Sequence, residues 1–134
     1  MHRIFTVFFV MALIGSVAAW AVTRPGVITD ADLDGLSGDP IAGAAVFWAA
    51  GCASCHAATG ATGDARLTLS GGQRFVSDYG VFVAPNISMH PQHGIGGWSV
   101  AQFVSALQMG TSPAGHHYYP AFPYTAYRLA ERQD

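Results

Sequence analysis

The longest hydrophobic segment lies at the start of the chain. Residues 4–22 are nineteen residues without a charged side chain, preceded by His2 and Arg3 and followed by Arg24. At about 1.5 Å of rise per residue, a helix of this length nearly matches the roughly 30 Å thickness of a bilayer's hydrocarbon layer. We therefore predict that residues 1–24 are a signal anchor that crosses a membrane, with Arg3 on the inner side.

The same segment also fits a cleaved signal peptide, which has a basic start, an apolar core and an A-x-A cleavage site. Ala19-Trp20-Ala21 matches that site. The bulky Trp20 and the unbroken apolar length favour the anchor. Both interpretations carry the remainder of the chain across the membrane.

Beyond this segment the pattern predicts a linker and a first domain helix. Residues 25–38 contain proline, glycines and aspartates, which is typical of a linker. Asp39 and Pro40 suit the N-cap and the first position of an Ala-rich helix over residues 41–50. Gly51 is expected to end this helix.

A second helix is predicted from Ser99, which forms a capping box with Gln102, to Gly110. Its apolar face at helical spacing consists of Val100, Phe103, Val104 and Leu107. Residues 66–97 between the helices alternate short apolar runs with glycine, proline and asparagine. We expect mostly loop there, although residues 79–84 could form a short strand, so the expected fold class is all-α.

The charged residues limit the classes of partner. The chain has no lysine, and beyond Arg24 four arginines stand against all eight acidic residues. Nucleic-acid binding requires a basic face, so that function is excluded. Four aspartates cluster at residues 30–39, as either a solvated acidic linker or a patch that steers a basic redox partner.

One motif indicates a specific chemistry, and it contains both cysteines of the chain. Cys52-Ala53-Ser54-Cys55-His56 has the spacing of covalent c-type haem attachment. The two cysteines lie about one helical turn apart, so both sulfurs can reach the vinyl groups on one edge of the porphyrin. His56 follows at once as the proximal iron ligand. We predict one covalently attached haem c.

Three alternative chemistries fit this motif less completely. A structural zinc site requires four ligands, and no second Cys or His pair has suitable spacing. A redox-active dithiol is expected at the start of a helix in an α/β domain, which this pattern does not predict. A disulfide between Cys52 and Cys55 leaves His56 unexplained.

Three further motifs lie downstream, at residues 85–88 (PNIS), 94–98 (GIGGW) and 119–124 (YPAFPY). With the haem motif, they resemble a class I c-type cytochrome domain. They are most similar to the modules in cytochrome subunits of bacterial membrane-bound dehydrogenases. The resemblance covers residues 39–128. It implies a small domain over residues 39–134, with few helices and long loops around haem, which transfers electrons and is not itself an enzyme.

Two departures affect what the resemblance implies. In better-known members the loop at residues 119–124 supplies a methionine as distal iron ligand, whereas this chain has Phe122, which cannot bind iron. Such domains also end in a helix that packs near Gly43 and Phe47, and the sequence stops where that helix would begin. We therefore expect the domain to be C-terminally incomplete.

The distal ligand has four alternatives. His117 is the first candidate, and either His117 or His116, together with the proximal His56, would give bis-histidine coordination and a low reduction potential. Met109 or Met89 would give a His/Met site. An empty sixth position would leave a haem that binds small ligands.

The expected function is electron transfer. A haem domain in the periplasm, tethered to the bacterial inner membrane through residues 4–22, would carry single electrons between a dehydrogenase or quinol-oxidising complex and a terminal acceptor. Its partners would be redox proteins, and if the first segment is cleaved the protein would be soluble in the periplasm. The alternatives are a five-coordinate peroxidase-like or gas-binding protein, and a truncated fragment without function.

Overall fold

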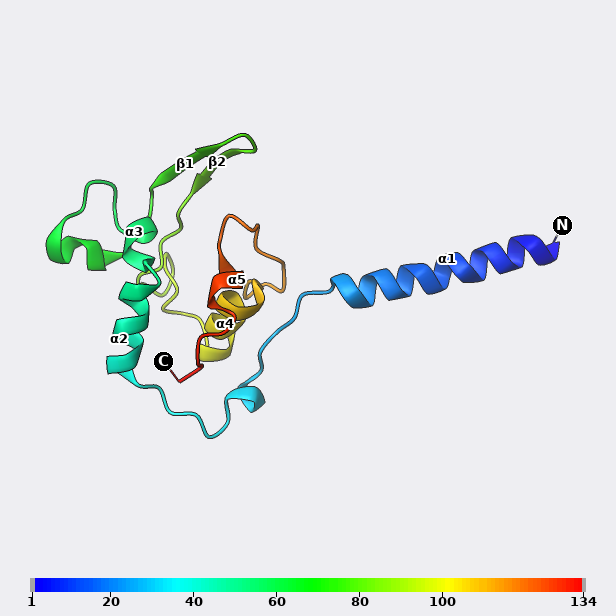
Figure 1. The fold of residues 1–134 in the computed structure, drawn as a ribbon, viewed down its shortest axis with the longest axis horizontal. Coiled ribbons are helices and arrows are strands. Elements are labelled where there is room, and N and C mark those ends of the chain that lie inside the picture. The colour runs from blue at the N-terminus through cyan, green and yellow to red at the C-terminus, as the bar shows by residue number, and fades with distance from the viewer. Residues whose placement is uncertain (1, 134) are drawn as a thin grey trace.

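The computed structural model describes residues 2–133. A long helix, α1 (His2–Thr23), projects away from a domain formed by the rest of the chain (Figure 1). Its side chains are exposed. Within the described residues it is the one helix long and apolar enough to cross a membrane. The predicted N-terminal helix is therefore confirmed, and it is consistent with both an anchor and a signal sequence.

The domain is built from short elements joined by long loops. After α1 they are, in chain order, the 3₁₀-helix η1 (Asp30–Leu33), α2 (Pro40–Ala49), α3 (Cys52–His56), the 3₁₀-helix η2 (Gly63–Thr68), β1 (Arg74–Ser77), β2 (Gly80–Val83), α4 (Val100–Val104), the π-helical turn η3 (Ser105–Met109) and α5 (Tyr124–Tyr127).

The start of α2 is confirmed as predicted. The Asp39 carboxylate accepts hydrogen bonds from the backbone N–H groups of Ile41 at 2.8 Å and Ala42 at 3.1 Å, and Pro40 occupies the first helical position. Gly51 follows in the left-handed region at φ +70°, which glycine adopts without steric cost. The chain turns there and continues into α3, so the predicted end of the first helix is also confirmed.

The expectation of a purely α-helical domain is wrong at residues 74–83. Strands β1 and β2 pair antiparallel, with Arg74 opposite Val83 and Ser77 opposite Gly80. Each strand has four residues, and neither has a buried side chain. The sequence of an exposed strand lacks the alternation of apolar and polar residues that identifies a half-buried strand. The Phe82 ring stacks on Tyr119 with centroids 5.0 Å apart, which ties the hairpin to the loop at residues 119–124.

Helix α4 begins as predicted, but it buries a different face. Ser99 accepts a hydrogen bond from the Gln102 N–H at 3.1 Å, and the Gln102 side chain accepts one from the Ser99 N–H at 2.9 Å. Val104 is buried, whereas Val100 is 68% and Phe103 is 41% exposed. The small Ala101 is buried instead, on the side where the linker packs. The predicted apolar face is therefore only partly correct.

The buried side chains of the domain are small. The residue before α2 and residue 133 also lie in contact with each other. Close packing of η1 on α4, of α5 on η3 and of α2 on α3 holds the loops together. The Asp39 N–H donates to the Gln133 carbonyl at 2.7 Å, so the start of α2 lies beside residue 133. The buried apolar residues among those described are Ala53, Ala57, Ala84, Ala101, Val104 and Ala106.

Candidate haem-attachment site

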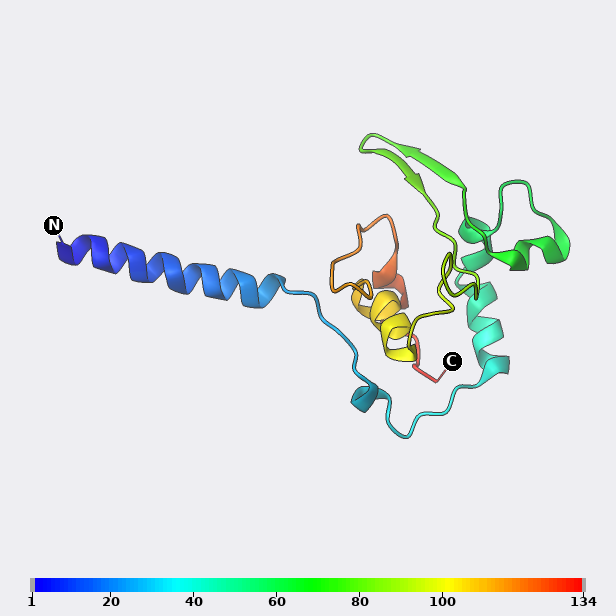
Figure 2. The ribbon, with the colours of Figure 1, turned by 180° about the vertical axis from the view of Figure 1, so that it is seen from behind.

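The sequence motif lies on α3, on the side of the domain remote from α1 in both views (Figures 1 and 2). Cys52 is half-buried and Cys55 is exposed, and both thiols are free. Burial raises the pKa of the Cys52 thiol, and a negative charge on Cys55 would raise it further, against the lowering effect of a backbone hydrogen bond. The one-turn spacing places both sulfurs at one site, as the motif predicts.

His56 is oriented by a backbone carbonyl from a distant loop. Its ring nitrogen Nδ1 lies 2.8 Å from the Pro85 carbonyl oxygen. A carbonyl can only accept a hydrogen bond, so Nδ1 carries the proton and donates. The lone pair of the neutral ring is then on Nε2, which is the tautomer that a metal-ligating histidine requires. Pro85 opens one of the downstream motifs, so the structure brings these two motifs together.

Gly71 makes this approach possible. Its N–H donates to the His56 carbonyl at 2.7 Å, and its φ of +71° lies in the left-handed region. A Cβ built at Gly71 would lie 2.5 Å from the carbonyl oxygens of Ala84 and Pro85. Only glycine lets the two backbones come this close, so Gly71 positions Pro85 against the histidine.

Gln73 is a second positioning residue, and no pattern in the sequence points to it. Its side-chain amide donates to the carbonyls of Ser54 at 3.1 Å and Ala57 at 3.2 Å. Ser54 lies in α3 and Ala57 follows its last residue. The last four carbonyl groups of a helix have no partner within the helix, and in a helix of five residues these are most of them. A glutamine in a glycine-rich segment has no distinctive pattern, and only the folded structure shows its role.

A cluster of aromatic rings lies beside the cysteines. The Tyr127 hydroxyl donates to the Ala50 carbonyl at 3.4 Å. Burial raises the pKa of Tyr127, and charges on Cys52 and Cys55 would raise it further because these thiols lie close by. The Tyr127 side chain therefore reaches the segment that leads into the haem motif, while α5 itself packs on η3.

Phe122 belongs to this cluster and is half-buried. Its ring centroid lies 5.7 Å from that of Tyr118, 6.0 Å from Tyr127 and 6.3 Å from Tyr124. Burial raises the pKa of the Tyr118 hydroxyl. Through Tyr127, Phe122 is joined to the surroundings of the cysteine motif.

The candidate distal ligands have other contacts. His117 Nε2 donates to the Thr23 carbonyl at the end of α1, at 2.7 Å, and ligation through Nε2 would require this bond to break. The methyl group of Met109 lies 2.5 Å from where a Cβ on Gly26 would be. Met89 is 77% exposed, and His116 is also exposed. Among residues 2–133, the His56 ring is hydrogen-bonded to Pro85 and to none of these side chains.

The residues of this site fit a covalently bound haem. Two free thiols one turn apart match its two vinyl groups, and the tautomer of His56 leaves Nε2 free for iron. Apolar side chains that the described protein atoms leave partly uncovered could pack on a porphyrin; they include Trp48, Phe103, Met109 and Tyr119. Within residues 2–133, no group of three or more His, Cys, Asp or Glu side chains gathers to form another metal site.

Comparison with known proteins agrees with this geometry. The chain is 54% identical over 135 residues to a protein of Cereibacter sphaeroides named diheme cytochrome c-type, a match that takes in all of this chain and 45% of that relative. This similarity supports a c-type cytochrome module in the chain. The module is also 38% identical over 86 residues to the fructose dehydrogenase cytochrome subunit of Gluconobacter japonicus, covering 64% of this chain and 17% of that subunit.

A third relative of the cytochrome module is the cytochrome c subunit of the alcohol dehydrogenase (quinone) of Gluconobacter oxydans. It is 33% identical over 81 residues, which are 60% of this chain and 16% of that subunit. The chain thus spans less than half the length of each of these three relatives. No known protein-family model matches it. The predicted similarity to the cytochrome modules of membrane dehydrogenases is confirmed.

Proposed function

We propose that this protein is a membrane-tethered electron carrier whose haem domain faces the periplasm. The observation that carries the proposal is the hydrogen bond from His56 to Pro85, beside two free thiols on the same short helix. Haem c, when bound, supplies a one-electron iron couple. The chain's own residues would fix the histidine tautomer, hold the group covalently through Cys52 and Cys55, and surround it with apolar side chains.

The anchoring and the partners belong to the same proposal. α1 would remain as the membrane anchor of residues 1–24, residues 25–38 would connect it to the domain, and residues 39–134 would form the haem domain. The relatives named as dehydrogenase cytochrome subunits support a dehydrogenase or a quinol-oxidising complex as one redox partner. We propose one haem per chain because the sequence has one Cys-x-x-Cys-His motif. One relative is named diheme, so the number of haems per chain should be measured on the purified protein.

A second candidate function is a five-coordinate haem protein that binds small ligands. It is favoured by the contact of His117 with the end of α1, by that of Met109 with Gly26, and by Phe122 within the aromatic cluster. Among the protein ligands, His117 remains the first candidate, followed by His116, Met109 and Met89.

The optical spectrum of the purified protein separates these possibilities. We expect covalent haem with a six-coordinate low-spin spectrum in both redox states, and slow or no binding of carbon monoxide to the ferrous form. Rapid carbon monoxide binding without displacement of a ligand would contradict the electron-carrier proposal. His117→Gln and Met109→Leu then identify the sixth ligand, because only the ligating residue changes the spectrum when it is replaced.

A further inference from the structure

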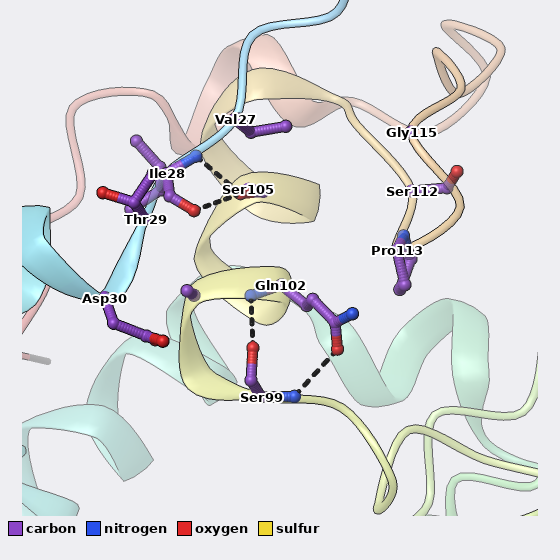
Figure 3. A pocket seen from close by; sticks show the side chains of 11 residues that line it. Val27, Ile28, Thr29, Asp30, Ser99, Gln102, Ser105, Ser112, Pro113 and Gly115 are labelled. Atoms are coloured by element: carbon purple, nitrogen blue, oxygen red, sulfur yellow. Dashed lines mark hydrogen bonds between the residues drawn. The ribbon is translucent and has the colours of Figure 1, made fainter.

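The segment that follows α1, up to the end of η1, is hydrogen-bonded to the haem domain. We call this segment, residues 24–33, the strap. Thr111 and Ser105 are the buried polar side chains of the described residues, and both bind it. Thr111 Oγ1 donates to the Gly26 carbonyl at 2.6 Å. As Figure 3 shows, Ser105 Oγ accepts from the Ile28 N–H at 2.8 Å and donates to the Ile28 carbonyl at 3.3 Å.

Two further features support a fixed strap. The Arg132 guanidinium donates to the Asp32 carbonyl at 3.2 Å. The Met109 methyl group occupies the space that a side chain at Gly26 would need, so strap and η3 are in close contact there. Release of the strap would break the three hydrogen bonds that the two hydroxyl groups make with it. The connection between α1 and the haem domain is therefore held against the domain by the strap.

The fixed strap determines which surface of the domain lies nearest to α1. The His117 ring donates to the carbonyl of Thr23, the last residue of α1, at 2.7 Å. Thr111 pairs with His117 in an isolated β-bridge, and the Ser112 N–H donates to the His116 carbonyl at 2.8 Å. Residues 112–119 thus form a tight loop next to the end of α1, as the orange segment in Figures 1 and 2 shows.

The chemistry of this loop suits the surface of a bilayer. Its residues are mostly exposed and include His116, His117 and Tyr119. Residues 79–130 contain no acidic residue, so the loop itself carries no carboxylate that would repel anionic headgroups. A carboxylate near it is that of Asp30 in the strap, which lines the same pocket as Ser112, Pro113 and Gly115 (Figure 3). At the end of α1, the Arg24 guanidinium lies 5.7 Å from the Trp20 ring, and both residue types are typical of the membrane interface.

We propose that residues 112–119 rest on the phospholipid headgroups of the membrane that α1 crosses, held there by the strap. This inference depends on the proposed anchoring by α1. Because α2 and α3 lie on the opposite side of the domain, the cysteine motif then faces the aqueous phase, where a redox partner can approach it.

Spin labels on the full haem-attached chain test this proposal. Ala114→Cys places a label on the loop, and Asp64→Cys places the matched control label on η2, an exposed position on the side of the domain remote from α1 (Figures 1 and 2). The protein is reconstituted into phosphatidylcholine–phosphatidylglycerol vesicles with and without a nickel-chelating lipid. The ratio of spin relaxation rates in the two kinds of vesicle cancels the constant effect of the haem iron.

We expect nickel lipid to increase relaxation several-fold more at residue 114 than at residue 64. Equal increases at the two positions would overturn the proposal. Extraction of the vesicles with alkaline carbonate is measured in parallel: release of the chain would contradict the anchoring itself, whereas a retained chain with equal labels would contradict only the headgroup contact.

A substitution tests the role of the strap separately. Thr111→Val removes the donor to Gly26 while keeping the size of the side chain. In the Ala114→Cys background we expect the nickel effect at residue 114 to fall, with the haem spectrum unchanged. An undiminished effect would overturn the role of the strap. If Thr111→Val does not accumulate as folded protein, Ser105→Ala tests the same attachment through Ile28.

Discussion

At the scale of single residues, the haem site depends on a glycine that has no chemistry of its own. Gly71 combines a left-handed φ with backbone contacts that leave no space for a side chain. It therefore controls the hydrogen bond between His56 and Pro85, which sets the tautomer of His56, the proposed proximal ligand. A substitution at this position should disturb the iron site without removing any ligand.

We expect Gly71→Ala to lower the stability of the haem-attached protein by more than the roughly 1–2 kcal/mol that a left-handed backbone costs a non-glycine residue. The excess comes from the contact of its Cβ with the carbonyls of Ala84 and Pro85. Thermal unfolding measures the loss, and a shift in reduction potential reports the disturbed histidine.

Gly72→Ala is the matched control, because Gly72 has a φ of +93° but open space where its Cβ would be. Equal losses of stability for the two variants would show that the close approach of the backbones is unimportant.

Asp32 offers a test of electrostatics in the strap. Its Oδ2 accepts hydrogen bonds from the hydroxyl of Thr29 at 2.6 Å and the Thr29 N–H at 2.8 Å, and these bonds, with a smaller effect of Arg132, lower the pKa of Asp32 below 3.8. Because the folded pKa is the lower one, the ionised carboxylate contributes stability above the unfolded pKa, and this contribution is lost as the pH falls through the folded pKa.

We expect Thr29→Ala to raise the pKa of Asp32 towards 3.8, since the hydroxyl donor is the largest cause of the shift. An NMR titration of the Asp32 carboxyl measures this directly. The wild type should also lose its stability advantage over Thr29→Ala in acid, below both pKa values. A carboxyl pKa that does not change on substitution would contradict this account.

At the scale of elements, local signals predicted helix ends well and predicted long-range packing poorly. Asp39, Ser99 and Gly110 mark ends that the structure confirms, because caps act within three residues. The strap could not be foreseen, since its hydrogen bonds with Ser105 and Thr111 join residues 77 and 85 positions apart. The sequence allows a short strand at residues 79–84 but does not indicate its pairing with β1, because both faces of the hairpin are exposed.

We expect Ser99→Ala to destabilise the domain by about 1 kcal/mol through loss of the N-cap of α4. Removal of the serine oxygen leaves the Gln102 N–H without its side-chain acceptor. Urea unfolding of the haem-attached protein measures the change. The control is Ser70→Ala, at an exposed serine that makes no side-chain hydrogen bond among residues 2–133; a loss of equal size there would contradict a capping role.

At the scale of the whole molecule, the domain has little apolar core of its own. The described residues bury alanines and one valine, while larger apolar side chains such as Trp48 and Tyr119 are about half exposed. Small side chains contribute little hydrophobic stabilisation, at about 25 cal/mol per Å² of buried area. The sequence predicted a domain built around a prosthetic group from its motif, and the sizes of the buried side chains agree with that prediction.

We expect the double variant Cys52→Ala/Cys55→Ala, which cannot form thioether bonds, to be digested several-fold faster by a protease than the haem-attached wild type. The reason is that the protein-only core is too small to hold the loops closed. The time course of limited proteolysis on a denaturing gel gives the rates. Haem-attached Ser70→Ala serves as the control, and equal digestion rates for the double variant and the wild type would contradict dependence on haem.

The hydrogen bond between Asp39 and Gln133 has a topological consequence. The start of α2 and residue 133, which lies beyond the end of α5, are in contact. The unit formed by residues 39–133 is therefore a closed loop in space. A unit whose two ends coincide can be placed within a longer polypeptide, or next to another copy, without a long connecting segment. Residues 39–133 thus have the geometry of a building block for proteins with several domains.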